Sequence, residues 1–219
     1  MHHLSALLLA CLLLLAGCTA NTATADGPDD DGFTALFDGE TLDGWETQSE
    51  WFRVEDGAIV GGSLDKPVTA TTFLATTGTY YNFELRYQLM IKGTRERANG
   101  GVQFRSVRND EGVSAIGYQS DAGQVYWGLI YDEGRRHQLL TEHPDGFSID
   151  DDINHGGWND FVVRAEDGHL QVWINGKLAS DYNEEDADIA AVTGFIAVQA
   201  HAGPPSEIWY RNLRIKELE

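Results

Sequence analysis

Apolar and polar residues alternate along most of the chain after residue 32. In FELRYQLMIK (83–92) every second residue up to Ile91 is apolar, and HLQVWI (169–174) repeats the pattern. A period of two places successive side chains on opposite faces of a strand. Outside the N-terminal stretch, no segment of ten or more residues keeps the 3.6-residue period that is typical of a helix. The alternation therefore predicts an all-β protein built from many short strands.

Turn-forming residues separate these predicted strands. Asp167-Gly168 and Asn175-Gly176 each lie between two alternating segments. Both dipeptides favour two-residue hairpins, because a type I′ turn needs positive φ at both central residues. Near the C-terminus, the alternation of residues 207–218 is interrupted at Asn212. Strands with one apolar and one polar face predict two antiparallel sheets packed as a β-sandwich.

The N-terminal residues form a segment of a different kind. LSALLLACLLLLA is continuously apolar but too short to span a membrane, which is typical of a secretory signal peptide. It ends in Leu-Ala-Gly-Cys18, which resembles the bacterial lipobox, although no Lys or Arg precedes it. We expect a lipoprotein signal peptide at residues 1–17 and a diacylglycerol on Cys18. An ordinary signal peptide that is cleaved later is the alternative.

Composition changes again after this segment. Residues 18–32 are small, polar and acidic, and predict a flexible tether, while residues 33–219 predict a single domain. Both cysteines lie in the first 18 residues, so the domain has no disulfide or cysteine metal site. The net charge of −20 argues against nucleic acid as a partner. We expect an exported protein, in the periplasm or at the cell surface, that meets the membrane only through its lipid anchor.

Seven segments, taken in order, resemble one family. They begin with FTALFDGETLDGW (33–45) and WFRVEDGAIVGG (51–62) and end with TGFIAVQAHAGPPSEIWYRNLRIKEL (193–218). This order resembles the DUF1080 family, also called the 3-keto-disaccharide hydrolase domain, and the resemblance implies a concanavalin A-like, LamG-like jelly roll. One strand departs from the family pattern. Many relatives read G-Y-E-x-Q where this chain reads GYQSD, so Gln119 stands in place of a carboxylate and Asp121 in place of an amide.

The resemblance implies cleavage of glycosides whose sugar carries a ketone at C3. Such a ketone acidifies the proton on C2, so that a base can remove it and form an enolate. The substituent on C1 then departs, and addition of water gives net hydrolysis. This chemistry needs a base that works near neutral pH, hydrogen-bond donors for the enolate oxygen and an acid for the leaving group.

Polar side chains on the non-core faces of the predicted strands are the candidate site. Alternation assigns to these faces Arg86, Gln88, Gln103, Arg105, Gln119, Asp121, Gln199 and His201. They converge if their strands are neighbours in one sheet, and otherwise they form ordinary solvated faces. We expect His201 to transfer protons, since a histidine titrates near neutral pH, with Asp121 as the alternative base. The alternatives without a catalytic role are a histidine at a loop edge and an aspartate in a turn.

The remaining candidates are an acid and a group of sugar-binding side chains. Glu133 is the candidate acid, and a turn carboxylate paired with Arg135 is the alternative. Sugar binding is predicted for Arg86, Gln103, Arg105, Gln119, Gln199 and Trp127, because guanidinium groups make bidentate contacts and aromatic rings stack on sugars. Alternation separates Tyr126 from Trp127, so at least one of the two is expected in the core.

No cofactor and no metal site are predicted. The acidic residues of SIDDDINH (148–155) could offer oxygen ligands to calcium, but a solvated acidic loop is favoured because the spacing is not that of an EF-hand. The predicted function is a glycoside-cleaving enzyme that acts on an oxidised disaccharide or glycoside. The alternatives are a carbohydrate-binding module without catalytic activity, because one fold serves both functions, and an envelope scaffold protein.

Overall fold

The protein is described here by a computed structural model that covers residues 32–112 and 114–219. These residues form fifteen strands and one short helix. One group of strands comprises β1 (Thr34–Ala35), β3 (Phe52–Glu55), β4 (Ala58–Ser63), β6 (Phe83–Gly93), β11 (Asn159–Glu166), β12 (His169–Ile174), β13 (Lys177–Asn183) and β15 (Ser206–Glu217). The other comprises β2 (Trp45–Glu46), β5 (Thr72–Thr76), β7 (Asn99–Arg108), β8 (Ala115–Gly123), β9 (Ile130–Glu133), β10 (Gln138–Leu139) and β14 (Phe195–Ala200). The helix is α1 (Ile149–Asp152).

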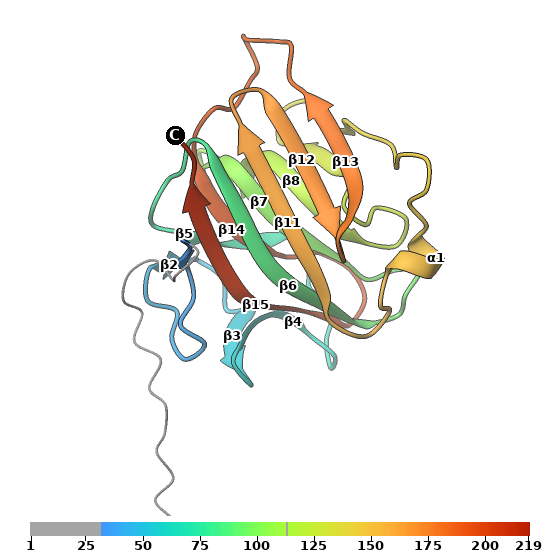
Figure 1. Ribbon diagram of the computed structural model, residues 1–219. Helices are drawn as coiled ribbons and strands as arrows, with labels where there is room; N and C mark the ends of the chain where they lie inside the picture. Colours follow the sequence, from blue (N-terminus) through green and yellow to red (C-terminus); the bar gives the residue numbers. More distant parts are fainter. Residues whose placement is uncertain (1–31, 113) are drawn as a thin grey trace, which may run out of the picture.

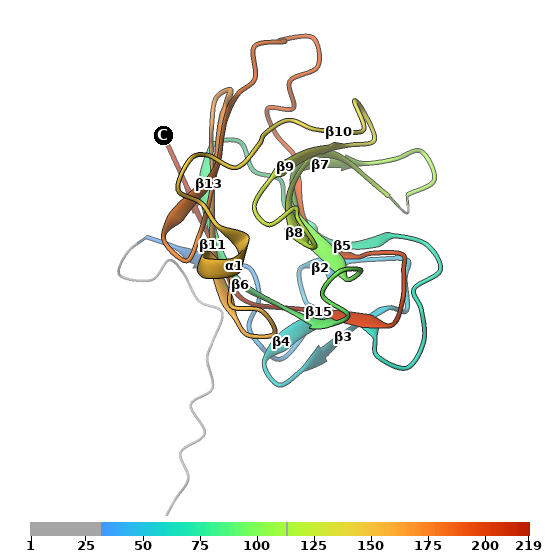
Figure 2. The same cartoon turned by 90° about the vertical axis from the view of Figure 1, so that its right-hand side faces the viewer.

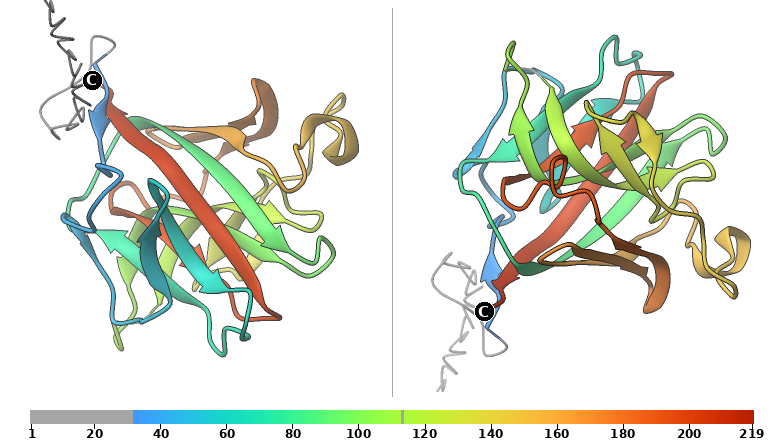
Figure 3. Two further views of the ribbon diagram at one scale, coloured as in Figure 1. Left: turned by 90° about the horizontal axis from the view of Figure 1, so that it is seen from below. Right: turned by 90° about the horizontal axis from the view of Figure 1, so that it is seen from above.

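These strands make two antiparallel sheets that face each other (Figures 1 and 2). The first sheet has the order β13-β12-β11-β6-β15-β4-β3, with β1 paired to β15. The second has the order β10-β9-β8-β7-β14-β5-β2. Figure 3 shows the C-terminal strand β15 crossing the middle of the first sheet beside β6. The predicted antiparallel sandwich is confirmed.

The core lies between the sheets and is built from the alternating apolar residues. Along β6, Phe83, Leu85, Tyr87 and Leu89 are buried in it, while the residues between them are partly exposed. The Tyr87 ring stacks on Phe161 of β11 with 5.0 Å between ring centroids. Burial of this kind stabilises by about 25 cal/mol for each Å² of apolar surface removed from water. The period of two in the sequence therefore identifies the residues that point into the core.

The predicted interruption of β15 is also present. Its register against β6 shifts between Arg211 and Arg214, and Asn212 has a φ of 54°. The extra residue at this bulge changes the phase of the alternation. Tyr210 on one side and Leu213 on the other can therefore both point into the core.

The two predicted hairpin turns differ from each other. At Asn175-Gly176 both residues have positive φ, 50° and 81°, as a type I′ turn requires. At the first hairpin Asp167 has a φ of 49°, but Gly168 is outside the positive region, so the type I′ prediction is wrong there. The reason is tertiary. Asn82 Oδ1 accepts a hydrogen bond from Asp167 N at 2.8 Å, and Arg105 donates to the Asp167 carbonyl.

We expect Asn175→Ala to lower the free energy of unfolding by about 1–2 kcal/mol. Alanine tolerates positive φ poorly, and it removes the bonds from Asn175 Nδ2 to Asp152 O (2.7 Å) and Asn159 Oδ1 (2.9 Å). Urea unfolding measures the change, and Asn175→Gly, which tolerates the same φ, separates the backbone contribution from the side-chain contribution. An alanine variant as stable as the parent protein would contradict this account.

The predicted signal peptide, Cys18 and the tether up to residue 31 lie outside the described residues. Within the described part of the chain, no helix is both long enough and apolar enough to cross a membrane.

Candidate functional site

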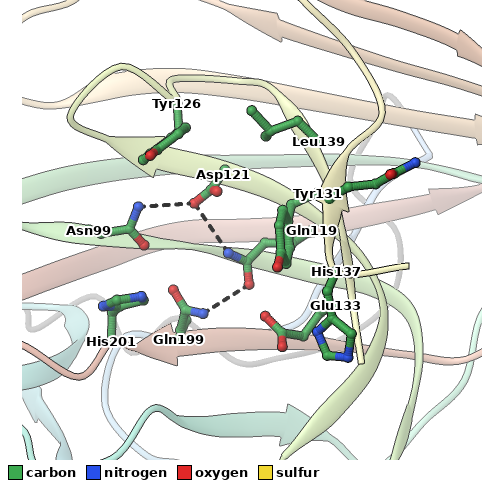
Figure 4. Close-up of a pocket in the computed structure, with 11 residues that line it drawn as sticks. Asn99, Gln119, Asp121, Tyr126, Tyr131, Glu133, His137, Leu139, Gln199 and His201 are labelled. Carbon is green, nitrogen blue, oxygen red and sulfur yellow. Dashed lines mark hydrogen bonds between the residues drawn. The ribbon is translucent and has the colours of Figure 1, made fainter. Parts of the chain in front are cut away.

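A pocket of about 390 Å³ opens on the face of the second sheet that is turned away from the core (Figure 4). Alternation along β8 explains this position, because Tyr118 and Ala122 lie in the core while Gln119 and Asp121 point into the pocket. The lining residues come from five strands and the loops beside them: Asn99, Gln119, Asp121, Tyr126, Tyr131, Glu133, His137, Gln138, Leu139, Gln199 and His201. The pocket is therefore a feature of the polar face of one sheet.

A glycine keeps the floor of the pocket open. Gly101 of β7 lies opposite Asp121 of β8, and the register of β7 with β14 places Gln199 on its other side. A Cβ atom at Gly101 would lie 2.7 Å from Ser120 O and 3.0 Å from Gln119 Cγ. Because Gly101 brings no side chain to this row, the Gln199 amide can reach across β7 to Gln119.

A chain of buried amides runs along this floor. Ser106 Oγ donates to Gln103 Oε1 at 2.8 Å, and Gln103 Nε2 donates to Gln119 Oε1 at 2.9 Å. Gln199 Nε2 donates to the same Gln119 oxygen at 3.1 Å, and Gln119 Nε2 donates to Asp121 Oδ1 at 3.2 Å. Each donor faces an acceptor, so the chain of bonds has one direction and ends on the Asp121 carboxyl group.

The surroundings of Asp121 suit a proton-transfer group. Burial raises the pKa of Asp121 to about 7, although hydrogen bonds from Gln119, Ala122 and Asn99 act in the opposite direction. The negative charge of Glu133 adds to the rise. All three hydrogen bonds are accepted by Oδ1, which leaves Oδ2 as the oxygen that can carry a proton. Both protonation states of Asp121 are therefore populated near neutral pH.

His201 follows β14 and has a fixed tautomer. Its Nδ1 lies 2.6 Å from the carbonyl oxygen of Ala202. A carbonyl oxygen can only accept a hydrogen bond, so Nδ1 carries the proton and Nε2 of the neutral ring carries the lone pair. Burial lowers the pKa of His201 below its ordinary value of 6.5. His201 is thus neutral at pH 7 and offers Nε2 as a base.

Glu133 of β9 is a second carboxyl group in the same pocket. Burial raises the pKa of Glu133, the nearby His137 lowers it, and the charge of Asp132 raises it again. In Figure 4, Glu133 and His137 lie at the end of the pocket opposite His201. Groups able to exchange protons with a ligand thus stand at both ends of the cavity.

The sequence matches the profile of the 3-keto-alpha-glucoside-1,2-lyase-like domain over residues 32–216. The chain belongs to this family. The match covers nearly all of the described residues, and it places the pocket in a carbohydrate-related jelly-roll domain. None of the curated proteins searched matches the chain in sequence.

Several solved structures have a fold similar to that of this chain. A proposed glycosyl hydrolase from Parabacteroides distasonis is 20% identical, with a TM-score of 0.63 over 86% of this chain and 95% of that one. The carbohydrate-binding module CBM66 from Bacillus subtilis is 12% identical, with a TM-score of 0.59 over 80% and 96% of the two chains. A Bacillus subtilis protein with a galectin-like fold is 10% identical, with a TM-score of 0.60 over 80% and 90%. At these identities the likeness shows the jelly-roll fold alone.

Most of the predicted site residues of the family domain come together. His201, Asp121, Glu133, Gln119 and Gln199 all line the pocket. Gln103 is fully buried and holds Gln119 from beside it, so it positions a lining residue without lining the pocket. Asn99, His137, Gln138 and Leu139 also line the pocket and were not predicted from the sequence, while Tyr126 and Tyr131, from the aromatic segment that supplied Trp127, line it as well.

Arg86 lies far from this group in the topology. It belongs to β6, in the first sheet, and forms an ion pair with Glu84 at 2.6 Å while its guanidinium group covers the Phe33 ring. Gln88 lies on the same strand and donates to Asp160. The predicted convergence is therefore wrong for these two residues, because alternation fixes the face of a strand but not the sheet to which the strand belongs.

Trp127 is part of the core and not of the pocket. Its ring packs edge-on against His155 and tilts against Phe161, with centroids 6.1 and 6.4 Å away. Its neighbour Tyr126 lines the pocket. The expectation that one of these two aromatic residues is in the core is confirmed, but the choice of Trp127 as the stacking residue is wrong.

Arg105 has a structural position. It is 1% exposed and donates to the Tyr81 carbonyl at 2.8 Å, to Asn82 Oδ1 at 3.0 Å and to the Asp167 carbonyl. Its φ of 47° lies at a register shift between β7 and β8, which breaks the alternation that predicted a pocket-facing side chain. The guanidinium group thus ties the second sheet to the ends of β6 and β11.

We expect Arg105→Met to lower the free energy of unfolding by about 2–4 kcal/mol, because it removes three hydrogen bonds that the buried guanidinium group donates. Arg164→Met is the matched control. Its ion pair with Glu166 is over 40% exposed on both sides, so the expected loss is under about 1 kcal/mol. Urea unfolding of the two variants tests the difference, and equal losses would contradict a structural role for Arg105.

The acidic loop around α1 is held by cations of the chain itself. Asp150 pairs with Arg95 at 2.5 Å and Asp152 pairs with Lys177 at 2.6 Å. In residues 32–112 and 114–219, no group of three or more His, Cys, Asp or Glu side chains is placed to hold a metal ion.

Proposed function

We propose that the protein cleaves glycosides whose sugar carries a ketone at C3, and that the pocket of the second sheet is the active site. One observation carries the proposal: His201 and Asp121 line one pocket and have pKa values shifted in opposite directions. A histidine that is neutral and an aspartate that is partly protonated at the same pH are the base and the acid that such a reaction needs. Membership of the lyase-like family supports the substrate class.

The proposed reaction begins at C2 of the sugar. His201 Nε2 takes the C2 proton, and the electron pair of the C2–H bond moves to the C3 ketone as an enolate. When the enolate collapses, the C3 carbonyl re-forms, a C1–C2 double bond forms and the C1–O bond breaks. Asp121 Oδ2 gives its proton to the departing oxygen. Water adding across the double bond then gives net hydrolysis, and release before this addition gives a lyase.

Amide groups are the proposed donors to the enolate oxygen. Neither Lys nor Arg lines the described pocket. Asn99 and Gln119 each use one amide hydrogen on Asp121 Oδ1, so each has a second hydrogen to donate. The Tyr126 and Tyr131 hydroxyl groups are further donors at the rim. Fixed dipoles of this kind stabilise developing charge without reorganisation.

The test is turnover by the purified protein. Methyl 3-keto-glucoside and 3-keto-trehalose are each compared with the same glycoside before oxidation, and the released aglycone or sugar is measured. We expect release only from the oxidised compounds, since only these have an acidic C2 proton. No release from any of them would contradict the proposal.

A carbohydrate-binding module without catalysis is the second candidate. It is favoured by the structural likeness to CBM66 and by Gln119, which stands where many relatives carry a carboxylate. This function predicts that oxidised and unoxidised sugars bind without any release of product.

A further inference from the structure

One buried oxygen atom in the pocket has no partner in the described part of the protein. Gln199 is 1% exposed, and its Oε1 accepts no hydrogen bond. The orientation of this amide is fixed, because Gln119 Oε1 can only accept and so must face Gln199 Nε2. Figure 4 shows the Gln199 side chain in the part of the pocket where His201 and Asn99 also lie. The unpaired acceptor therefore belongs to a side chain that lines the cavity.

An unpaired buried acceptor favours a ligand that donates. Leaving such a group without a partner costs about 1–3 kcal/mol. A sugar hydroxyl at Gln199 Oε1 would remove that cost on binding. His201 Nε2 is a second acceptor in the cavity, because its Nδ1 is already committed to the Ala202 carbonyl.

The described pocket has acidic residues but no permanently charged basic residue in its lining. Asp121 and Glu133 line it, and neither Lys nor Arg does. The nearby guanidinium groups are already paired elsewhere: Arg135 binds Asp132, and Arg136 binds both Asp132 and Glu184. A carboxylate or phosphate on a ligand would thus meet negative charge with no Lys or Arg of the lining to balance it, and like charges brought together cost several kcal/mol.

We propose that the pocket selects uncharged, hydroxyl-bearing sugars, with Gln199 Oε1 as an acceptor for one sugar hydroxyl and Glu133 as the residue that excludes sugars bearing a carboxylate or phosphate. The inference rests on the proposed function in one respect, namely that this pocket is where the sugar binds. It goes further because it names the class of sugar and the residues that select it.

The charge selection is tested by binding, with sugars that cannot be cleaved. Methyl glucoside, methyl glucuronide and methyl glucoside 6-phosphate are titrated into the full domain and followed by NMR. We expect the two anionic sugars to bind at least about tenfold more weakly than methyl glucoside, which corresponds to about 1.4 kcal/mol. Glu133→Gln should narrow this gap, whereas Asp150→Asn, an exposed carboxylate on α1, should leave it unchanged.

High salt separates the pocket from the charge of the whole protein. The net charge of −20 also repels anions, but at 1 M ionic strength the screening length falls to about 3 Å. The effect of Glu133→Gln should persist under these conditions, because the charge acts at contact distance. If the difference in affinity between neutral and anionic sugars disappeared at high salt in the parent protein, only the net charge of the whole protein would repel anions. This result would overturn the role of Glu133.

The hydroxyl selection is tested with monodeoxy glucosides. One deoxy position should weaken binding to the parent protein by about tenfold. In Gln199→Met that deoxy sugar and the full sugar should bind equally, while Gln171→Met, on the first sheet, should behave as the parent does. Equal binding of all deoxy sugars to the parent protein, or equal binding of neutral and anionic sugars, would overturn the inference, as would no binding of any sugar. Selective binding without cleavage of 3-keto-glucosides would instead sustain it and contradict the proposed function.

Discussion

Replacing Asp121 by Asn is expected to lower kcat/KM for a 3-keto-glucoside by about 100- to 10,000-fold, the usual contribution of a general acid. Asn is similar in size, and its carbonyl oxygen can still accept the bonds from Gln119, Asn99 and Ala122. It has no proton to give to the leaving oxygen. Initial rates with the same substrate for both proteins measure the loss.

The pH dependence of this variant should change as well. In the parent protein, kcat/KM should rise as His201 loses its proton, below pH 6.5, and fall as Asp121 loses its proton, near pH 7. The falling limb should be absent from Asp121→Asn, since the titrating acid has been removed. A variant that keeps the falling limb near pH 7 would contradict the assignment of Asp121 as the acid.

The same substitution should stabilise the protein at alkaline pH. The pKa of Asp121 rises from 3.8 to about 7 on folding, so between these values the folded state binds more protons than the unfolded state. Stability therefore falls as pH rises through this window, by an amount on the order of a few kcal/mol. Asn carries no charge and avoids this loss. Asp121→Asn should unfold at higher urea concentration than the parent protein at about pH 8, whereas Asp150→Asn, an exposed control, should not.

Loss of activity together with a gain in stability separates function from structure. If the carboxylate served only to hold β8 in place, its replacement would lower both the activity and the stability. An Asp121→Asn protein that is less stable than the parent at about pH 8 would contradict the assignment.

Replacing His201 by Gln is the second large effect, with an expected loss of about 100-fold or more in kcat/KM. Gln can keep a hydrogen bond to the Ala202 carbonyl, but it has no basic nitrogen to take the C2 proton. In this variant, the rise of kcat/KM with pH that His201 causes should disappear. His169→Gln is the matched control, because His169 is partly exposed on the first sheet and pairs with Asp181.

Binding distinguishes this loss from a structural one. His201→Gln should bind an uncleaved glucoside within a few-fold of the parent protein, because the substitution removes a base and leaves the floor of the pocket in place. If His201→Gln cleaved the substrate as fast as the parent protein, a group other than His201 would have to take the C2 proton. This result would contradict the mechanism.

The sequence predicted the sandwich well because alternation has a direct physical cause. Each strand buries one face, so the apolar period of β6 and β12 reports the core without knowledge of the partner strands. The same logic placed Gln119, Asp121, Gln199 and His201 on outward faces. These four residues share a pocket because β8, β7 and β14 are neighbours, and this order is a property of the topology.

Strand order and local irregularity account for the failures. Arg86 alternates correctly on β6, yet β6 belongs to the other sheet. Arg105 follows the alternating pattern in sequence, but its positive φ at a register shift directs the side chain to the carbonyl groups of Tyr81 and Asp167. Neither the pairing of distant strands nor a single positive φ at an arginine leaves a signal in the hydrophobic pattern.

The exchanged pair on β8 is clearer in the structure than in the sequence. The family pattern that this strand resembles has a carboxylate and then an amide at positions 119 and 121, where this chain has Gln119 and Asp121. Two residues apart on a strand, they share one face, and Gln119 Nε2 donates to Asp121 Oδ1. A hydrogen-bonded carboxylate–amide pair is thus present in this chain, with the carboxylate beside Gly101 at the open floor of the pocket.

The proposed mechanism requires that the C2–H bond breaks during cleavage. A 3-keto-glucoside labelled with deuterium at C2 is incubated with the protein in ordinary water, and the sugar product is analysed by mass spectrometry against a sample without protein, which measures spontaneous exchange. We expect the product to have lost the label, whether it is released as an unsaturated sugar or after addition of water. A product that keeps deuterium at C2 would show that the glycosidic bond broke without removal of the C2 proton, and would contradict the proposed mechanism.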